Sequence, residues 1–126
     1  MTEISFPWPP SQLSPNARIH WAARAKIAKK YKESCYLLAV SAKLGSAIEH
    51  IQANPTSRIK LDVIFYPPDR RHRDSDNMVA SAKYLLDGLA AALNVNDRLF
   101  LPTFKFEDEV KGMVKVQILA VDSNAE

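Results

Sequence analysis

The spacing of apolar residues changes several times along this chain, and each change marks the boundary of a predicted element. Four segments alternate apolar with polar or small side chains, the pattern of a strand with one buried face. They span residues 3–8, Arg58–Tyr66, Leu99–Glu107 and Lys111–Val121. Proline pairs, which cannot donate to a ladder, follow the first two, and Pro102 in the third predicts an edge position, a bend or a bulge.

Two longer segments place apolar residues at helical spacing. The first runs from about Ile19 to Leu44, with Gly45 as a stop, and carries Cys35 on its apolar stripe. The second runs from Asp76 to Leu93. Residues 46–57 leave room for a further helical turn. We expect Cys35 to be a core residue rather than a nucleophile.

These elements follow one another in the order β-α-β-α-β-β. A chain of 126 residues is long enough for one hydrophobic core and too short for two. The last two strands are expected to form a hairpin, with its turn near residues 109–112. We therefore predict a single domain, residues 1–126, of the α/β (α+β) class, with a mixed β-sheet of about four strands packed with two main helices.

Composition narrows the possible functions mainly by exclusion. The chain is 47% hydrophobic and 25% charged with 3 glycines, which is ordinary for a globular protein. Its single cysteine excludes an internal disulfide and a multi-cysteine zinc site, and fits a reducing compartment. No apolar run approaches the roughly 18 residues of a membrane span. The first residues lack the features of a signal peptide, so we expect a cytoplasmic protein. The three histidines are scattered, which argues against a histidine metal site.

Positive charge is concentrated more than the net charge of +3 indicates. Six Lys or Arg residues and no acid lie between Arg18 and Lys32. Such a segment gains affinity for a phosphate backbone by releasing counterions. A solvated helix face explains the same charges equally well.

The richest candidate chemistry lies in the run Arg70-Arg71-His72-Arg73-Asp74-Ser75-Asp76-Asn77. If the backbone between Asp74 and Asp76 is extended, both carboxylates point the same way and offer hard oxygen ligands to one Mg²⁺. Arginines beside them suit phosphate. The combination indicates phosphodiester chemistry on nucleic acid, although an Asp-x-Asp-Asn run is also a common helix cap.

The second predicted helix continues this polar surface. Lys83 and Asp87 lie within about 20° of Asp76 on a helical wheel, apart from the apolar face. Lys83 and Asp87 are also four residues apart, so an ordinary surface ion pair is an alternative for them. Asp97 follows the helix in a polar turn. If that turn and the end of the strand at Tyr66 lie on the same edge of the fold, Asp97 joins Asp74 and Asp76 around one or two Mg²⁺ ions.

Motifs in the same order along the whole chain resemble those of the RusA-like Holliday-junction resolvases, small endodeoxyribonucleases of bacteria and their prophages. The matching segments are Phe6-Pro7-Trp8-Pro9-Pro10-Ser11, the basic segment from Arg18-Ile19-His20-Trp21, Arg73-Asp74-Ser75-Asp76-Asn77, Lys83, Leu86-Asp87-Gly88-Leu89, and Asn96-Asp97. Two positions depart from the family pattern. Asn96 stands where an acid is frequent, and Lys83 lies one turn later than the lysine of some members.

The resemblance implies a Mg²⁺-dependent endonuclease, with Mn²⁺ as a substitute, that resolves four-way DNA junctions by paired symmetric nicks during recombination and repair. It implies that Asp74, Asp76 and Asp97 bind the metal and that these aspartates and Lys83 are catalytic. Asn77 and Asp87 are further candidates. It also implies a mixed α/β fold and a homodimer, with no membrane and no small-molecule cofactor as partner.

DNA phosphates would be held by the basic segments, which position the junction without reading its sequence. The residues concerned are Arg18, Arg24, Lys26, Lys29, Lys30, Arg70, Arg71 and Arg73. Trp21 and Tyr31 are each able to stack on an opened base, but we expect buried packing for both.

Two other classes of protein remain open. One is a DNA-binding module that does not cut, for which missing metal ligands would be the sign. The other is a small basic scaffold or phage accessory protein whose carboxylates only cap helices. Metal binding separates the classes, because a capping-only protein binds Mg²⁺ no worse after Asp76→Asn.

Overall fold

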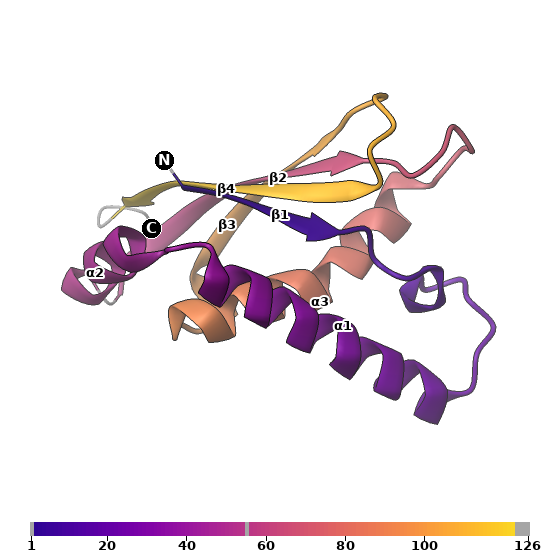
Figure 1. The fold of residues 1–126 in the computed structure, drawn as a ribbon, viewed down its shortest axis with the longest axis horizontal. Helices are drawn as coiled ribbons and strands as arrows, with labels where there is room; N and C mark the ends of the chain where they lie inside the picture. The colour runs from indigo at the N-terminus through magenta and orange to yellow at the C-terminus, as the bar shows by residue number, and fades with distance from the viewer. Residues whose placement is uncertain (1, 55, 123–126) are drawn as a thin grey trace.

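The computed structural model describes residues 2–54 and 56–122 of the chain. The elements are β1 (Thr2–Pro7), α1 (Trp21–Ser41), α2 (Gly45–Ala53), β2 (Arg58–Tyr66), α3 (Ser75–Leu93), β3 (Phe100–Phe106) and β4 (Met113–Asp122), with short 3₁₀ turns at Ser11–Leu13 and Asp97–Leu99 (Figure 1). The predicted order of strands and helices is confirmed, with α2 as an addition. The bounds of β2 agree with the prediction.

The four strands form one mixed sheet in the order β1-β4-β2-β3. β4 runs antiparallel to both β1 and β2, whereas β3 runs parallel to β2. The predicted α+β fold with a mixed sheet of about four strands is therefore confirmed. Pro102 lies in β3 at an edge of the sheet, as expected.

The predicted hairpin of the last two strands is wrong, because β2 lies between β3 and β4. Ile64 is buried although it points away from Val63 and Phe65, so β2 suits a central position, and Pro102 confines β3 to the edge. The chain after β3 crosses the end of β2. There the N–H of Gly112, whose φ is 67°, donates to the Pro67 carbonyl at 3.0 Å.

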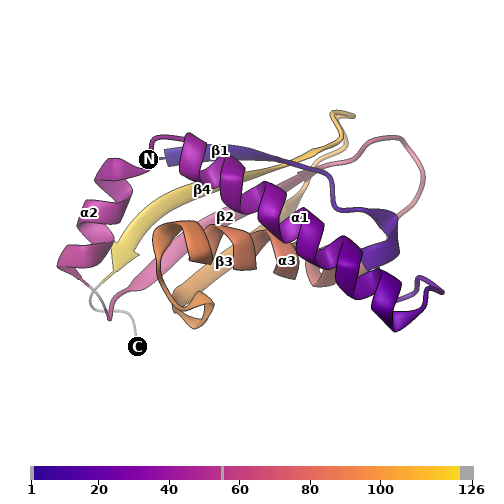
Figure 2. The same ribbon diagram turned by 60° about the horizontal axis from the view of Figure 1, so that its bottom comes forward.

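α1 and α3 cover one face of the sheet (Figure 2). The core between the layers is built on α3 residues Leu85, Leu89 and Leu93 and on the inward side chains of the strands. The opposite face carries charged pairs between neighbouring strands. Lys105 contacts Asp62 at 2.8 Å and Lys115 contacts Glu3 at 3.3 Å. Inward apolar and outward polar positions thus give the alternation seen in the sequence.

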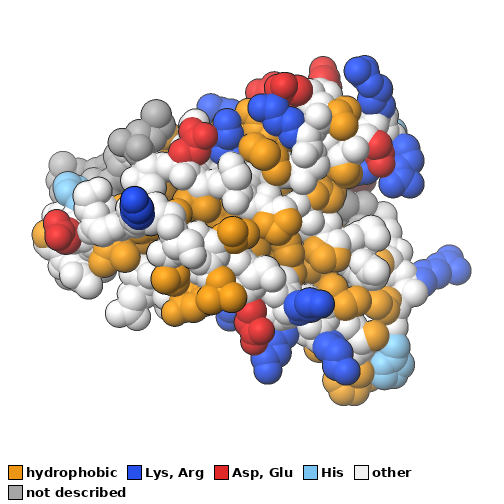
Figure 3. Space-filling view, viewed as in Figure 1, with side chains coloured by type: hydrophobic (Ala, Val, Ile, Leu, Met, Phe, Trp, Pro, Cys, Tyr) orange, Lys and Arg blue, Asp and Glu red, His pale blue; other side chains and the backbone are white. Residues whose placement is uncertain are grey.

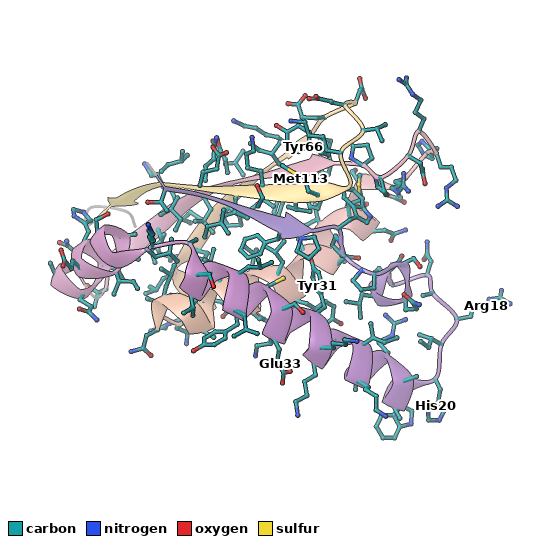
Figure 4. The ribbon with its side chains drawn as sticks, in the orientation of Figure 1. Arg18, His20, Tyr31, Glu33, Tyr66 and Met113 are labelled. Atoms are coloured by element: carbon teal, nitrogen blue, oxygen red, sulfur yellow. The ribbon has the colours of Figure 1, made fainter. Side chains whose placement is uncertain are left out.

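α1 and α3 approach closely at Gly88. A Cβ atom at this position would lie 2.8 Å from the Lys32 carbonyl oxygen and 3.0 Å from the Cys35 Cβ. Cys35 is fully buried in this contact, and burial raises the pKa of its thiol to about 11. Its core assignment is confirmed. Tyr31 lies between α1 and the end of β1, where its hydroxyl donates to the Pro7 carbonyl at 2.7 Å (Figure 4).

The first helix is shorter than predicted at both ends. His20 caps it, because its Nδ1 accepts from the Ala22 N–H at 3.2 Å, so the helix begins after this residue. It ends at Ser41, and Lys43 adopts a left-handed backbone with φ 57°. Gly45, predicted as a stop, is instead the first residue of α2. Within the ranges that the structure describes, no helix has the length and apolar character needed to cross a membrane.

Candidate functional site

Asp74 and Asp76 lie where the loop after β2 enters α3. Asp74 is the N-cap, and its Oδ1 accepts from the Asp76 N–H at 3.0 Å. Asp76 stands in the first helical turn, and both residues are exposed. The capping alternative is therefore correct for Asp74. Only one of its oxygens is used in the cap, so Oδ2 stays available to another ligand.

Asp69 organises the arginines of the same loop. Its Oδ2 lies 3.1 Å from Arg71 Nη2, and its Oδ1 lies 2.9 Å from Arg73 Nη1. Hydrogen bonds from Arg73 and then from Arg71 hold the pKa of the Asp69 carboxyl well below its usual range. Sequence reasoning missed Asp69, although its spacing to these arginines was visible. Arg70 is exposed and has no ion pair among the described residues.

Aromatic side chains stand behind this loop. The guanidinium of Arg73 lies 5.6 Å from the ring centre of Trp8, which meets Phe65 edge-on at 5.9 Å. Phe106 stacks on Phe65 at 5.2 Å with an interplanar angle of 10°. Each of these rings lies in a predicted strand, but their grouping was not predicted. The stack of Phe106 on Phe65 depends on β3 lying beside β2.

Two clefts adjoin these rings. One of about 550 Å³ is lined by the arginine loop, Trp8, Phe65 and Phe106. The other, of about 270 Å³, is lined by Asp74, Asn77 and Ser81 and shares Trp8 and Arg73 with the first. Asn77, a further candidate from the sequence, thus lies beside Asp74.

Asp97 lies at the other end of the sheet. It follows Asn96, whose Oδ1 accepts from the Arg98 N–H at 3.0 Å, and precedes β3. Since β3 runs parallel to β2 and Phe100 pairs with Ile59, this turn is next to the start of β2. The expectation that it shares an edge with Tyr66 is therefore wrong. Within one chain Asp97 does not join Asp74 and Asp76.

Asp97 instead meets Asp87. Partial burial of Asp87 and its contact with the Asp97 carboxyl raise the pKa of Asp87, against the opposing effect of Lys32 and Lys83. Asp87 lies eleven residues after Asp76, which is about 16 Å along a helix. Lys83 lines a cleft of about 250 Å³ together with Asp97. The catalytic candidates thus form two groups along α3, one at its start and one nearer its end, where Asp97 joins from the following turn.

The geometry of these groups limits how a metal would bind. No cluster of three or more acidic, histidine or cysteine side chains able to hold one ion occurs among the described residues. Mg²⁺ commonly takes one or two carboxylates and keeps several waters. The backbone between Asp74 and Asp76 is not extended, because Ser75 is already the first residue of α3, so the condition for both carboxylates to point the same way is not met. Asp74 and Asp76 supply two exposed carboxylates at the start of α3, and Asp87 and Asp97 supply two that are in contact.

The basic segment that precedes and begins α1 is exposed to solvent. Arg18, Lys26, Lys29 and Lys30 are exposed and form no ion pair within the described chain. Arg24 has another task, because its guanidinium donates to the carbonyls of Ser14 at 3.2 Å and Ala17 at 3.0 Å. It therefore fastens the preceding loop to the helix.

The two α1 residues considered for base stacking, Trp21 and Tyr31, lie in different surroundings. Tyr31 is buried, as predicted, but Trp21 is 76% exposed, so the prediction of buried packing is wrong for it. Trp21 begins the helix and lies against His20, with ring centres 5.6 Å apart. Figure 4 shows His20 and Arg18 at the end of α1 that extends beyond the sheet. Because this end of α1 extends beyond the sheet, Trp21 does not face the hydrophobic core.

Comparison with known proteins gives one close relationship. No model of a known protein family matches the chain. An uncharacterized protein from Xylella fastidiosa (strain Temecula1 / ATCC 700964) is 36% identical over 127 residues, which cover 99% of this chain and 80% of that protein. The chain belongs to the same family as that protein.

Proposed function

We propose that the protein is a Mg²⁺-dependent, structure-selective endodeoxyribonuclease that resolves four-way DNA junctions in the cytoplasm during recombination and repair. The observation that carries the proposal is the pair of exposed carboxylates at Asp74 and Asp76 next to arginines ordered by Asp69. Acidic oxygens for a metal and guanidinium groups for phosphate are the parts that phosphodiester hydrolysis needs. The RusA-like order of motifs supports the same reaction.

The chain's own residues have distinct tasks in this proposal. The helix cap fixes Asp74 Oδ1, so the free oxygen keeps one direction. Arg73 is held between Asp69 and Trp8 and needs little reordering to bind a phosphate. When bound at the aspartates, Mg²⁺ or Mn²⁺ supplies Lewis-acid activation of water and offsets negative charge. Lys83 adds positive charge near Asp97.

In this proposal, two protomers of a homodimer together complete the cutting site. Lys83 of α3 and Asp97 of the following turn belong to one group, while Asp74 and Asp76 at the start of α3 form the other. A two-fold arrangement that brings the first group of one protomer to the second group of its partner makes two complete sites. Two sites suit a junction with near two-fold symmetry, in which opposing strands are nicked.

α1 offers apolar surface for such a partner. Tyr36, Leu37, Leu38 and Val40 are 41%, 61%, 41% and 54% exposed. Figure 3 shows apolar side chains gathered over the part of this face where the C-terminal half of α1 lies. Large apolar side chains exposed together are typical of protein interfaces. A second copy of this chain is the occupant we propose.

The test separates cutting from binding. Purified protein is incubated with a synthetic four-way junction and with matched linear duplex, in Mg²⁺ and in EDTA. Asp74→Asn is the informative variant because asparagine also caps helices, so the fold is kept while a charged ligand is lost. We expect metal-dependent nicks on the junction alone, and no cutting but full junction binding by the variant. Equal loss of binding and cutting in a folded variant contradicts the proposal.

A second candidate is a DNA-binding module that does not cut, or a phage accessory protein of the same fold. The distance of Asp97 from Asp74 and Asp76 favours it if the chain acts alone. The result expected for this second candidate in the same experiment is tight junction binding without nicks, whichever metal is added. Unchanged Mg²⁺ binding after Asp76→Asn would give the carboxylates only a capping role.

A further inference from the structure

The larger of the two clefts, which adjoins the one that Asp74 lines, has two stacked aromatic rings in its wall. Phe65 is 1% exposed and covers one face of Phe106 in a parallel stack. Phe106 itself is 43% exposed, although it points toward the same side of the sheet as buried Phe100. Both rings line the cleft. A flat π-system is the partner that completes such a stack.

The cleft is lined by charges of both signs from two segments. Arg70, Arg71 and His72 come from the loop after β2, and Glu107 and Asp108 come from the segment after β3. The arginines suit a phosphate, whereas the carboxylates repel one and accept hydrogen bonds from amino groups. A nucleotide offers both features, with its phosphate and its base at opposite ends.

The cleft also lies next to the proposed cutting site. It shares Trp8 and Arg73 with the smaller cleft that holds Asp74. A volume of about 550 Å³ is enough for one base and its sugar. A strand whose phosphate reaches Asp74 would therefore leave an adjacent base within reach of Phe106.

We propose that this cleft receives one unpaired base of the DNA strand, stacked on the outer face of Phe106, beside the phosphate to be cut. The inference rests on the proposed function and deepens it, since it states which feature of branched DNA the protein selects. A base within a continuous duplex is paired and stacked on both sides, so it enters only at the cost of unpairing and unstacking, whereas a base at a branch point lacks a continuous stack and a bulged base is already unpaired. Selectivity for structure would then arise from this cleft.

The test measures binding to bulged duplexes in EDTA, where no cutting occurs. One duplex carries a single unpaired nucleotide, a second carries an abasic residue at the same place, and a third is fully paired. We expect the base-bearing bulge to bind about 5- to 100-fold more tightly than the abasic one. Phe106→Ala should remove this preference, and Phe106→Trp should retain it.

Val110→Ala is the matched control. Val110 is also 43% exposed and lies in the segment after β3, but it does not line the cleft. The control should keep the full preference. Thermal unfolding of each variant guards against a folding defect, and Phe106→Leu provides an apolar but non-aromatic side chain, which should lose most of the preference.

Two results would overturn the inference: equal binding of base-bearing and abasic bulges by the native protein, or an unchanged preference in folded Phe106→Ala. The outcome is separable from that of the proposed function. If the protein cuts junctions but shows no base preference, only the proposed base binding in the cleft is refuted. If it shows a base preference that depends on Phe106 but never cuts, only the proposed nuclease activity is refuted.

Discussion

The carboxyl groups of Asp87 and Asp97 lie within hydrogen-bonding reach, although one belongs to α3 and the other to the turn before β3. This contact fixes Asp97 beside the later part of α3, about 16 Å along the helix from Asp76. A single chain therefore holds two separate pairs of carboxylates.

The pair predicts a change of stability with pH. An acid whose pKa is raised on folding contributes stability below its ordinary pKa of 3.8, and this is lost as pH rises through the raised value. In EDTA, the free energy of unfolding of the native protein should fall between about pH 4 and about pH 7 relative to Asp87→Asn. The difference should stay under about 1 kcal/mol because the group is partly exposed. Urea unfolding of both proteins at both pH values measures this difference. If the free energies of unfolding of the two proteins change equally with pH, the prediction is contradicted.

Gly88→Ala tests the contact between the helices. The new Cβ would meet the Lys32 carbonyl at 2.8 Å, a backbone atom that is unable to move aside without shifting α1. We expect a loss of about 1–3 kcal/mol in the free energy of unfolding. Gly45→Ala is the control, since nothing lies within 4 Å of the added atom. It should be neutral or stabilise by up to about 1 kcal/mol. Equal destabilisation by both variants would refute the close approach.

Local patterns in the sequence predicted the elements well. Alternation in Arg58–Tyr66 gave β2 its bounds, and helical spacing with Asn94 after it gave the end of α3, where Asn94 adopts a left-handed φ of 57°. Pro102 gave the edge position of β3. These features depend on neighbouring residues, so the sequence carries them directly.

Long-range relationships were the ones missed. Adjacent strands with a short connection suggested a hairpin, but the doubly buried centre of β2 places it between β3 and β4. The position of Asp97 follows from that parallel pairing, and no local pattern reveals it. Asp69 and Phe106 were missed for the same reason, since their roles depend on what lies across the loop and the sheet.

Mixing two inactive variants tests whether the site is shared between protomers. Asp74→Asn and Asp97→Asn are each expected to abolish cutting. If each site draws Asp74 from one protomer and Asp97 from its partner, hybrid dimers contain one intact site. Junction nicking should then return to about half the native level in dimers of one variant with the other. A different affinity tag on each variant, with purification through both tags in turn, isolates the hybrid dimers, and hybrid dimers that stay inactive contradict a shared site.

Lys29→Ala tests the basic face of α1. Lys29 is exposed and lacks an ion pair in the described chain, so its loss should leave thermal stability unchanged. Junction affinity should fall, and the slope of its logarithm against the logarithm of salt concentration should decrease by about 1. Arg24→Ala should differ, because it breaks hydrogen bonds to Ser14 and Ala17 and so lowers stability. An unchanged salt slope after Lys29→Ala would contradict a phosphate contact at this residue.

A supercoiled plasmid that extrudes a cruciform tests junction resolution by paired nicks most directly. Two nicks made in opposing strands within the lifetime of one complex convert this plasmid to linear DNA, whereas single unpaired nicks release the cruciform and give relaxed circles. We expect linear product in Mg²⁺, none in EDTA, and none with Asp76→Asn. Relaxed circles alone, or equal cutting of a plasmid without the cruciform, would contradict junction resolution.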